Sequence, residues 1–213
     1  MTALAAIGVA VRSKANNPWL DRLLASLQRF RPGVPRAELW VEEGDRLTKV
    51  EKLNRLLRHG GVRYVCLLED DTEILHDDWL GGLIAGAQTI PDVALASPLE
   101  ASHQEHAPEA IAAALSPTMA DVTNVPGFCT LVDREAGLFF DVRVQTMSDL
   151  YLSLLARSRG WRCAQVRAAL VRHTKLPWAP DTTPPWQQGD RSRFGEADAY
   201  YARDRHQAKR VAE

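Results

Sequence analysis

The chain has 213 residues, 46% of them hydrophobic and 25% charged, which is enough for one substantial core but leaves little room for a second domain. A formal net charge of -1 excludes the broad positive surface that duplex nucleic acid or anionic lipid usually demands, so a nucleic-acid partner is not expected. The three cysteines lack the paired spacing of metal ligands and fit a reduced, intracellular setting.

The first predicted elements alternate between apolar strands and amphipathic helices. Residues 5–11 form an apolar run that predicts a buried strand, and this run is too short for a membrane span and lacks a preceding basic region. We therefore expect a cytoplasmic protein without a transmembrane segment. Pro18 opens a helical pattern, residues 39–41 predict a short strand, and Lys49–Arg58 predicts a helix that ends at Gly60.

The alternation continues with a wholly apolar strand over residues 64–68, the helix Trp79–Gln88 and a strand over residues 93–96. This order implies an α/β fold with a mostly parallel central sheet that helices cover on both faces. The later expected elements are a helix over 108–115, a strand over 128–132, a helix over 148–159 and a strand over 163–171. A loop rich in Pro and Trp then precedes a charged helix over 196–212.

Acidic residues follow two of the predicted strands directly. Glu42 and Glu43 end one strand, and the other runs into Glu69, Asp70 and Asp71. The carboxyl ends of parallel strands meet at one edge of a sheet, where ligands collect. Adjacent carboxylates repel one another, so a hard cation such as Mg²⁺ or Mn²⁺, bridging two phosphates, favours such a cluster. The competing interpretation is that the second group of acids only caps the next helix.

Several segments, in order, resemble family 2 GT-A glycosyltransferases. LLEDDTEILHDDWLGGLIAG is similar to the metal-binding DxD segment, with KLNRLL before it and GFCTLVDREAGLFFDVRV and SDLYLSLLARSRGW after it. The similarity covers most of residues 5–173. It implies a single GT-A (Rossmann-like) catalytic domain over residues 1–175, on which we expect residues 176–213 to pack as a loop and C-terminal helix.

The resemblance implies a nucleotide site in the first half of the chain. Arg12 and Ser13 match the loop on which the nucleotide packs, and Glu42 matches the acid that contacts its base or ribose. Lys52 and Asn54 match the segment that approaches the diphosphate. Competing interpretations are a solvated loop acid for Glu42 and an exposed helical lysine for Lys52.

The resemblance also implies a divalent metal, Mn²⁺ or Mg²⁺. Glu69 and Asp71 match the metal ligands, with Glu69 standing where the family usually has Asp. Asp70 between them belongs to the same metal motif and is expected to bind the cofactor, with Asp71 as the likeliest direct metal ligand. His173, just after a strand, matches a histidine that completes the metal shell, although a structural histidine is the competing interpretation.

For the acceptor side, the resemblance identifies Gly127, Phe128 and Cys129 as the bordering loop and Asp149 as the general base of inverting transfer. Ser148 replaces the Glu that normally precedes this base. The competing interpretation is that Asp149 merely favours the positive end of a helix dipole.

The expected activity is transfer of a sugar from a UDP-, GDP- or dTDP-linked donor to the hydroxyl of an unknown acceptor, and a homo-oligomer is compatible with the sequence. Two other functions remain open. A nucleotidyltransferase would usually carry a Gly-rich basic loop after the first strand, which VRSKANNP lacks. The Ser before Asp149 and the small size keep open a non-catalytic module that binds nucleotide sugars.

Overall fold

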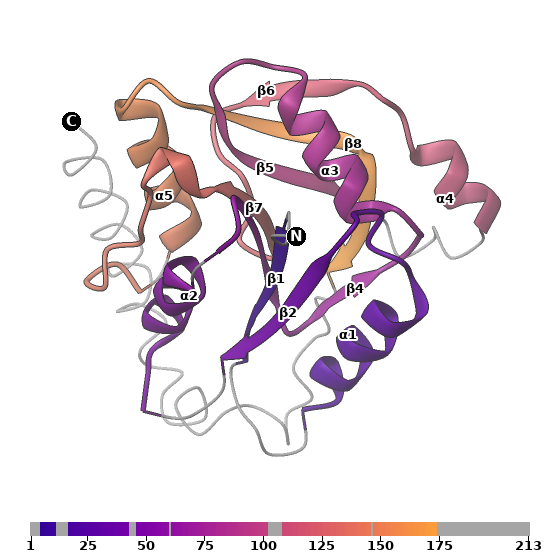
Figure 1. Ribbon diagram of the computed structural model, residues 1–213, viewed down its shortest axis with the longest axis horizontal. Coiled ribbons are helices and arrows are strands. Elements are labelled where there is room, and N and C mark those ends of the chain that lie inside the picture. Colours follow the sequence, from indigo (N-terminus) through magenta and orange to yellow (C-terminus); the bar gives the residue numbers. More distant parts are fainter. Residues whose placement is uncertain are drawn as a thin grey trace, which may run out of the picture.

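One mixed sheet forms the centre of the molecule, with helices on both of its faces (Figure 1). The computed structural model describes residues 5–11, 17–42, 46–59, 61–101, 108–145 and 147–173. The predictions for Arg12, Ser13 and residues 176–213 lie outside the described residues. Among the described helices, none combines the length and the apolar character that a membrane span requires.

The sheet has the strand order β2-β1-β3-β7-β5-β8-β4, and β6 pairs with β8. Its strands are β1 (Ala5–Ala10), β2 (Ala37–Glu42), β3 (Tyr64–Glu69), β4 (Thr72–Ile74), β5 (Val93–Glu100), β6 (Met119–Val122), β7 (Cys129–Asp133) and β8 (Arg162–His173). The helices are α1 (Pro18–Arg29), α2 (Lys49–Arg58), α3 (Trp79–Gln88), α4 (Pro108–Ala114) and α5 (Ser148–Ser158), with a 3-10 turn η1 (Arg134–Ala136). The short strands β4 and β6 are additions to the predicted elements.

The central strands are apolar throughout because successive side chains enter two different cores. Ile7 of β1 packs in a cluster with Leu23 of α1 and residues of α3. Its neighbour Ala6 packs in a second cluster with residues of α2 and α5, which lie together on the left of Figure 1. Gly8 permits close packing of α2, since a Cβ atom there would lie 3.2 Å from Leu56. Both faces of the sheet are therefore buried.

Local capping fixes the starts of the two helices that follow β1 and β2. The Asn17 side chain accepts hydrogen bonds from the backbone N–H groups of Trp19 and Leu20, and Pro18 occupies the first turn of α1. Thr48 and Glu51 form a reciprocal capping box at the start of α2. These caps set where each connection leaves the edge that carries the acids.

The α/β class is confirmed, and the sheet is parallel only in part. β1 is parallel to β2 and β3, and β5 is parallel to β8. β7 is antiparallel to both β3 and β5, and β4 and β6 are antiparallel to β8. Hydrophobic periodicity identifies a strand without giving its direction. As a result β7 begins where β3 ends, and the Glu69 N–H donates to the Phe128 carbonyl over 3.0 Å.

Candidate active site

Strand register brings the predicted acids to one edge of the sheet. Ala10, the last residue of β1, pairs with Glu42 on one side and with Glu69 on the other. His173 ends β8 and pairs with Thr72 of β4, the residue after Asp71. The prediction that the acidic strand ends share an edge is therefore confirmed, and the structure adds His173 to that edge.

Glu69, Asp71 and His173 form a compact cluster of ligand atoms. One such atom from each residue lies within 4.8 Å of the others. The His173 Nε2 atom is 3.4 Å from Asp71 Oδ1 and 3.9 Å from Glu69 Oε2. The two carboxylates suit Mn²⁺ or Mg²⁺, and the imidazole nitrogen favours Mn²⁺, because Mg²⁺ prefers oxygen ligands. The structure thus brings together the three residues predicted as metal ligands, and their donor atoms fit the predicted ion.

The ring of His173 has two further neighbours, Phe128 in the turn before β7 and Glu100 of β5. It stacks on Phe128 with the ring centroids 4.9 Å apart and an angle of 20° between the planes. Its Nδ1 atom lies 4.0 Å from Oε1 of Glu100, the last residue of β5. The Nδ1 atom is buried and makes no hydrogen bond within the described part of the chain, so Glu100 is a neighbour of the ring and not a hydrogen-bond partner. Sequence reasoning missed Glu100, although it too is an acid at the end of a strand.

Asp70 has a different neighbour from Asp71, the next residue. Its side chain is buried and accepts a 2.7 Å hydrogen bond from the amide of Asn17, the residue that caps α1. Asp70 thereby fastens the acidic turn to the start of α1. The competing interpretation, that these acids cap the following helix, does not hold, because β4 intervenes and α3 begins only after Asp78.

The two residues predicted to approach the diphosphate, Lys52 and Asn54, are bonded to different parts of the chain. Lys52 is buried and its ammonium donates to the Val11 carbonyl over 2.6 Å, just past the end of β1, so it is not an exposed helical lysine. Asn54 is also buried, and its amide bonds both the N–H and the carbonyl of Phe140 at 2.9 Å. Asn54 thus holds the segment before α5 in place.

Glu42, the acid predicted to contact the base or ribose, accepts a hydrogen bond of 3.4 Å from Arg55.

Asp149 lies next to the cluster at the start of α5. Its Oδ2 atom accepts a 3.1 Å hydrogen bond from the Gly127 N–H. A Cβ atom on Gly127 would lie 3.2 Å from Glu69 Oε1 and 3.4 Å from the Cβ of Asp149. Glycine therefore leaves room for both Glu69 and Asp149 beside this backbone segment, where a larger residue would crowd them. Asp149 also lines a small pocket with Gly127, Thr130 and Ser148.

Lys49, the first residue of α2, contacts both parts of the site. Its ammonium forms an ion pair with Glu69 Oε1, and its side chain lines the pocket that contains Asp149. Sequence reasoning missed this lysine. A usable signal was its place in the first turn of a helix, where the helix dipole favours acids over bases.

No family model matches the chain, and no curated protein matches its sequence. TarS from S. aureus matches with a TM-score of 0.57 and 12% identity, covering 82% of this chain and 37% of that chain. GalNAc-T7 in complex with UDP, GalNAc and Mn²⁺ matches with a TM-score of 0.58 and 12% identity, covering 80% of this chain and 44% of that chain. The mannosyltransferase PcManGT from Pyrobaculum calidifontis, in complex with GDP-Man and Mn²⁺, matches with a TM-score of 0.57 and 14% identity. That match covers 81% of this chain and 57% of that chain.

These similarities bear on the fold. The chain spans 37% to 57% of the length of these three proteins. Each match extends over about four fifths of this chain, which includes most of the central sheet and its helices. The described part of the chain therefore has a GT-A-like glycosyltransferase fold.

Proposed function

We propose that this protein is a metal-dependent glycosyltransferase that moves a sugar from a nucleotide-sugar donor to an acceptor hydroxyl. The observation that carries the proposal is the cluster of Glu69, Asp71 and His173 beside Asp149, at one edge of a GT-A-like sheet. A divalent ion held by this cluster would neutralise charge on the leaving nucleoside diphosphate. The matching structures support this donor class, since TarS is in complex with UDP in one and PcManGT with GDP-Man in another.

In this proposal the nucleotide lies along the ends of β1, β2 and β3. Glu42 would contact the base or ribose, because it ends β2 beside the last residue of β1. Buried Lys52 would support the same edge indirectly, through its hydrogen bond to the Val11 carbonyl. Arg12 and Ser13 remain predictions for the loop that follows. The donor base is left open among uridine, guanosine and deoxythymidine.

Asp149 would act as the base of an inverting reaction. Its carboxylate takes the proton of the acceptor hydroxyl while that oxygen bonds to the anomeric carbon, and the bond from that carbon to the diphosphate breaks. The hydrogen bond from Gly127 orients the carboxylate for this step.

The direct test is Asp149→Asn, which keeps the shape of the side chain and removes the base. We expect transfer, measured as release of nucleoside diphosphate, to fall by about 100-fold or more, because a positioned base contributes that much. Mn²⁺-dependent binding of the nucleotide should survive. Asp121→Asn, at an exposed acid of β6, is the matched control and should transfer normally. Unchanged turnover in Asp149→Asn would contradict the assignment of the base.

Product analysis and calorimetry separate the two other functions from glycosyl transfer. Release of pyrophosphate in place of nucleoside diphosphate would identify a nucleotidyltransferase. Calorimetric binding of UDP, GDP or dTDP sugars without turnover on any acceptor would identify a binding module.

A further inference from the structure

The two oxygens of the Glu69 carboxylate lie near different groups. The Lys49 ammonium contacts Glu69 Oε1, while Glu69 Oε2 lies 3.9 Å from His173 Nε2. An ion held between Glu69, Asp71 and His173 would therefore share the Glu69 carboxylate with a resident ammonium group. The Lys49 side chain is 36% exposed and also lines the pocket beside Asp149, so solvent reaches it.

Helix formation does not account for a lysine at this position. The amino end of a helix carries a partial positive charge, which favours acidic side chains in the first turn. Glu51 already fulfils that role in α2 through the capping box with Thr48. Lys49 adds positive charge to the same end, and its contact with Glu69 is the compensating interaction. This arrangement indicates that the position serves the site.

We propose that Lys49 couples metal binding to diphosphate binding, an inference that rests on the proposed function. Without a diphosphate, the ammonium neutralises Glu69 and repels a divalent cation, so the metal alone binds weakly. A diphosphate supplies negative charge that attracts both the ammonium and the metal, so each ligand strengthens binding of the other. Lys49 thereby favours the metal and nucleotide together over the metal alone.

Titration calorimetry tests this coupling. Mn²⁺ alone, UDP or GDP alone, and each nucleotide with saturating Mn²⁺ are titrated into the wild type, Lys49→Met and Lys49→Arg. We expect Lys49→Met to bind Mn²⁺ alone about tenfold more tightly, and the gain in nucleotide affinity from Mn²⁺ to shrink by about tenfold, within the usual range of coupling between sites. Lys49→Arg keeps the charge and should retain the coupling. Arg58→Met removes a charge from the exposed last turn of the same helix and should behave as the wild type.

Other results would overturn the inference. Unchanged coupling in Lys49→Met, or an equal loss in Arg58→Met, contradicts a specific role for Lys49 while leaving the proposed function intact. A wild type that binds neither Mn²⁺ nor the nucleotides contradicts the proposed function and this inference together. Lys49→Gln replaces Lys49→Met if the latter does not unfold cooperatively on heating.

Discussion

Single side chains at the acidic edge are held by partners that lie far away in the sequence. Asp70 is bonded by Asn17, and Asp71 faces His173. Asp149 is bonded by the backbone of Gly127. Adjacent acids therefore have different environments, and a string of carboxylates does not by itself identify those that can share an ion.

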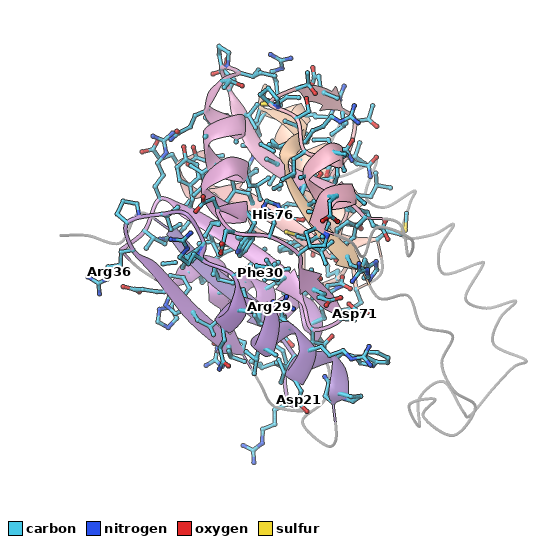
Figure 2. The ribbon with its side chains drawn as sticks, turned by 90° about the vertical axis from the view of Figure 1, so that its right-hand side faces the viewer. Asp21, Arg29, Phe30, Arg36, Asp71 and His76 are labelled. Atoms are coloured by element: carbon cyan, nitrogen blue, oxygen red, sulfur yellow. The ribbon has the colours of Figure 1, made fainter. Side chains whose placement is uncertain are left out.

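His76 provides a prediction at the scale of one residue. The Leu170 N–H donates to His76 Nε2 over 3.0 Å, so the neutral ring carries its proton on Nδ1, 2.7 Å from the Asp77 carbonyl. Burial lowers the pKa of His76 below its ordinary value of 6.5. In Figure 2, His76 is labelled above Phe30 and apart from Asp71.

The unfolded chain takes up a proton at this histidine near pH 6.5, whereas the folded protein resists it until the pH is lower. The free energy of unfolding should therefore be fully retained above about pH 6.5 and fall as the pH drops through the unfolded pKa. Urea unfolding at pH 7.5 and 5.5 measures this loss. His76→Gln should show a smaller loss, and an equal loss in both proteins would show that other groups cause it.

At the scale of elements, the direction of β7 decides how the site is built, and close packing holds α3 on the sheet. Because β7 is antiparallel to β3, the loop that contains Gly127 lies at the edge occupied by Glu69. Helix α3 packs through glycines on the middle of β8. A Cβ atom on Gly82 would lie 2.6 Å from the Ala168 carbonyl oxygen, and one on Gly86 would lie 2.3 Å from Val166.

Gly82→Ala should therefore destabilise the protein, although alanine is the better helix former by about 1 kcal/mol. The added methyl group meets backbone, which cannot move aside easily, and overpacking of this kind costs about 1–3 kcal/mol. Chemical denaturation measures the change. Ala85→Gly, at an exposed position of the same helix, calibrates helix propensity and should lose about 1 kcal/mol. A more stable Gly82→Ala would contradict the close packing of α3 on β8.

For the whole molecule, the cluster joins strands that are distant in the sequence. Glu69 ends β3, Asp71 precedes β4 and His173 ends β8. Ligands held between them would bind only the folded chain, because the unfolded chain does not keep these residues together. Binding at the cluster should thus stabilise the fold as a unit.

We expect Mn²⁺ with UDP or GDP to raise the thermal unfolding midpoint. At concentrations about 100-fold above Kd, the stabilisation is about 2.7 kcal/mol, which corresponds to roughly 5 °C or more for a chain of this size. Asp71→Asn should abolish the shift, and Asp121→Asn should retain it. An equal shift in Asp71→Asn, measured by scanning fluorimetry, would place the bound metal elsewhere.

The sequence by itself determined most of the elements and part of the site. Apolar runs, helix caps and the acids at the ends of β2 and β3 are local features, so the α/β fold and a shared acidic edge were predictable from them. The GT-A resemblance supplied His173 and Asp149 as candidates, although no local pattern connected them with Glu69.

Only the tertiary structure decided which side chains meet. The direction of β7, the burial of Lys52 and the pairing of Lys49 with Glu69 depend on contacts between segments far apart in the chain. Periodicity and propensity act over a few residues, whereas strand direction and register follow from how all the layers pack together. Because of that packing, Asp70 bonds to Asn17 while the adjacent Asp71 lies beside His173.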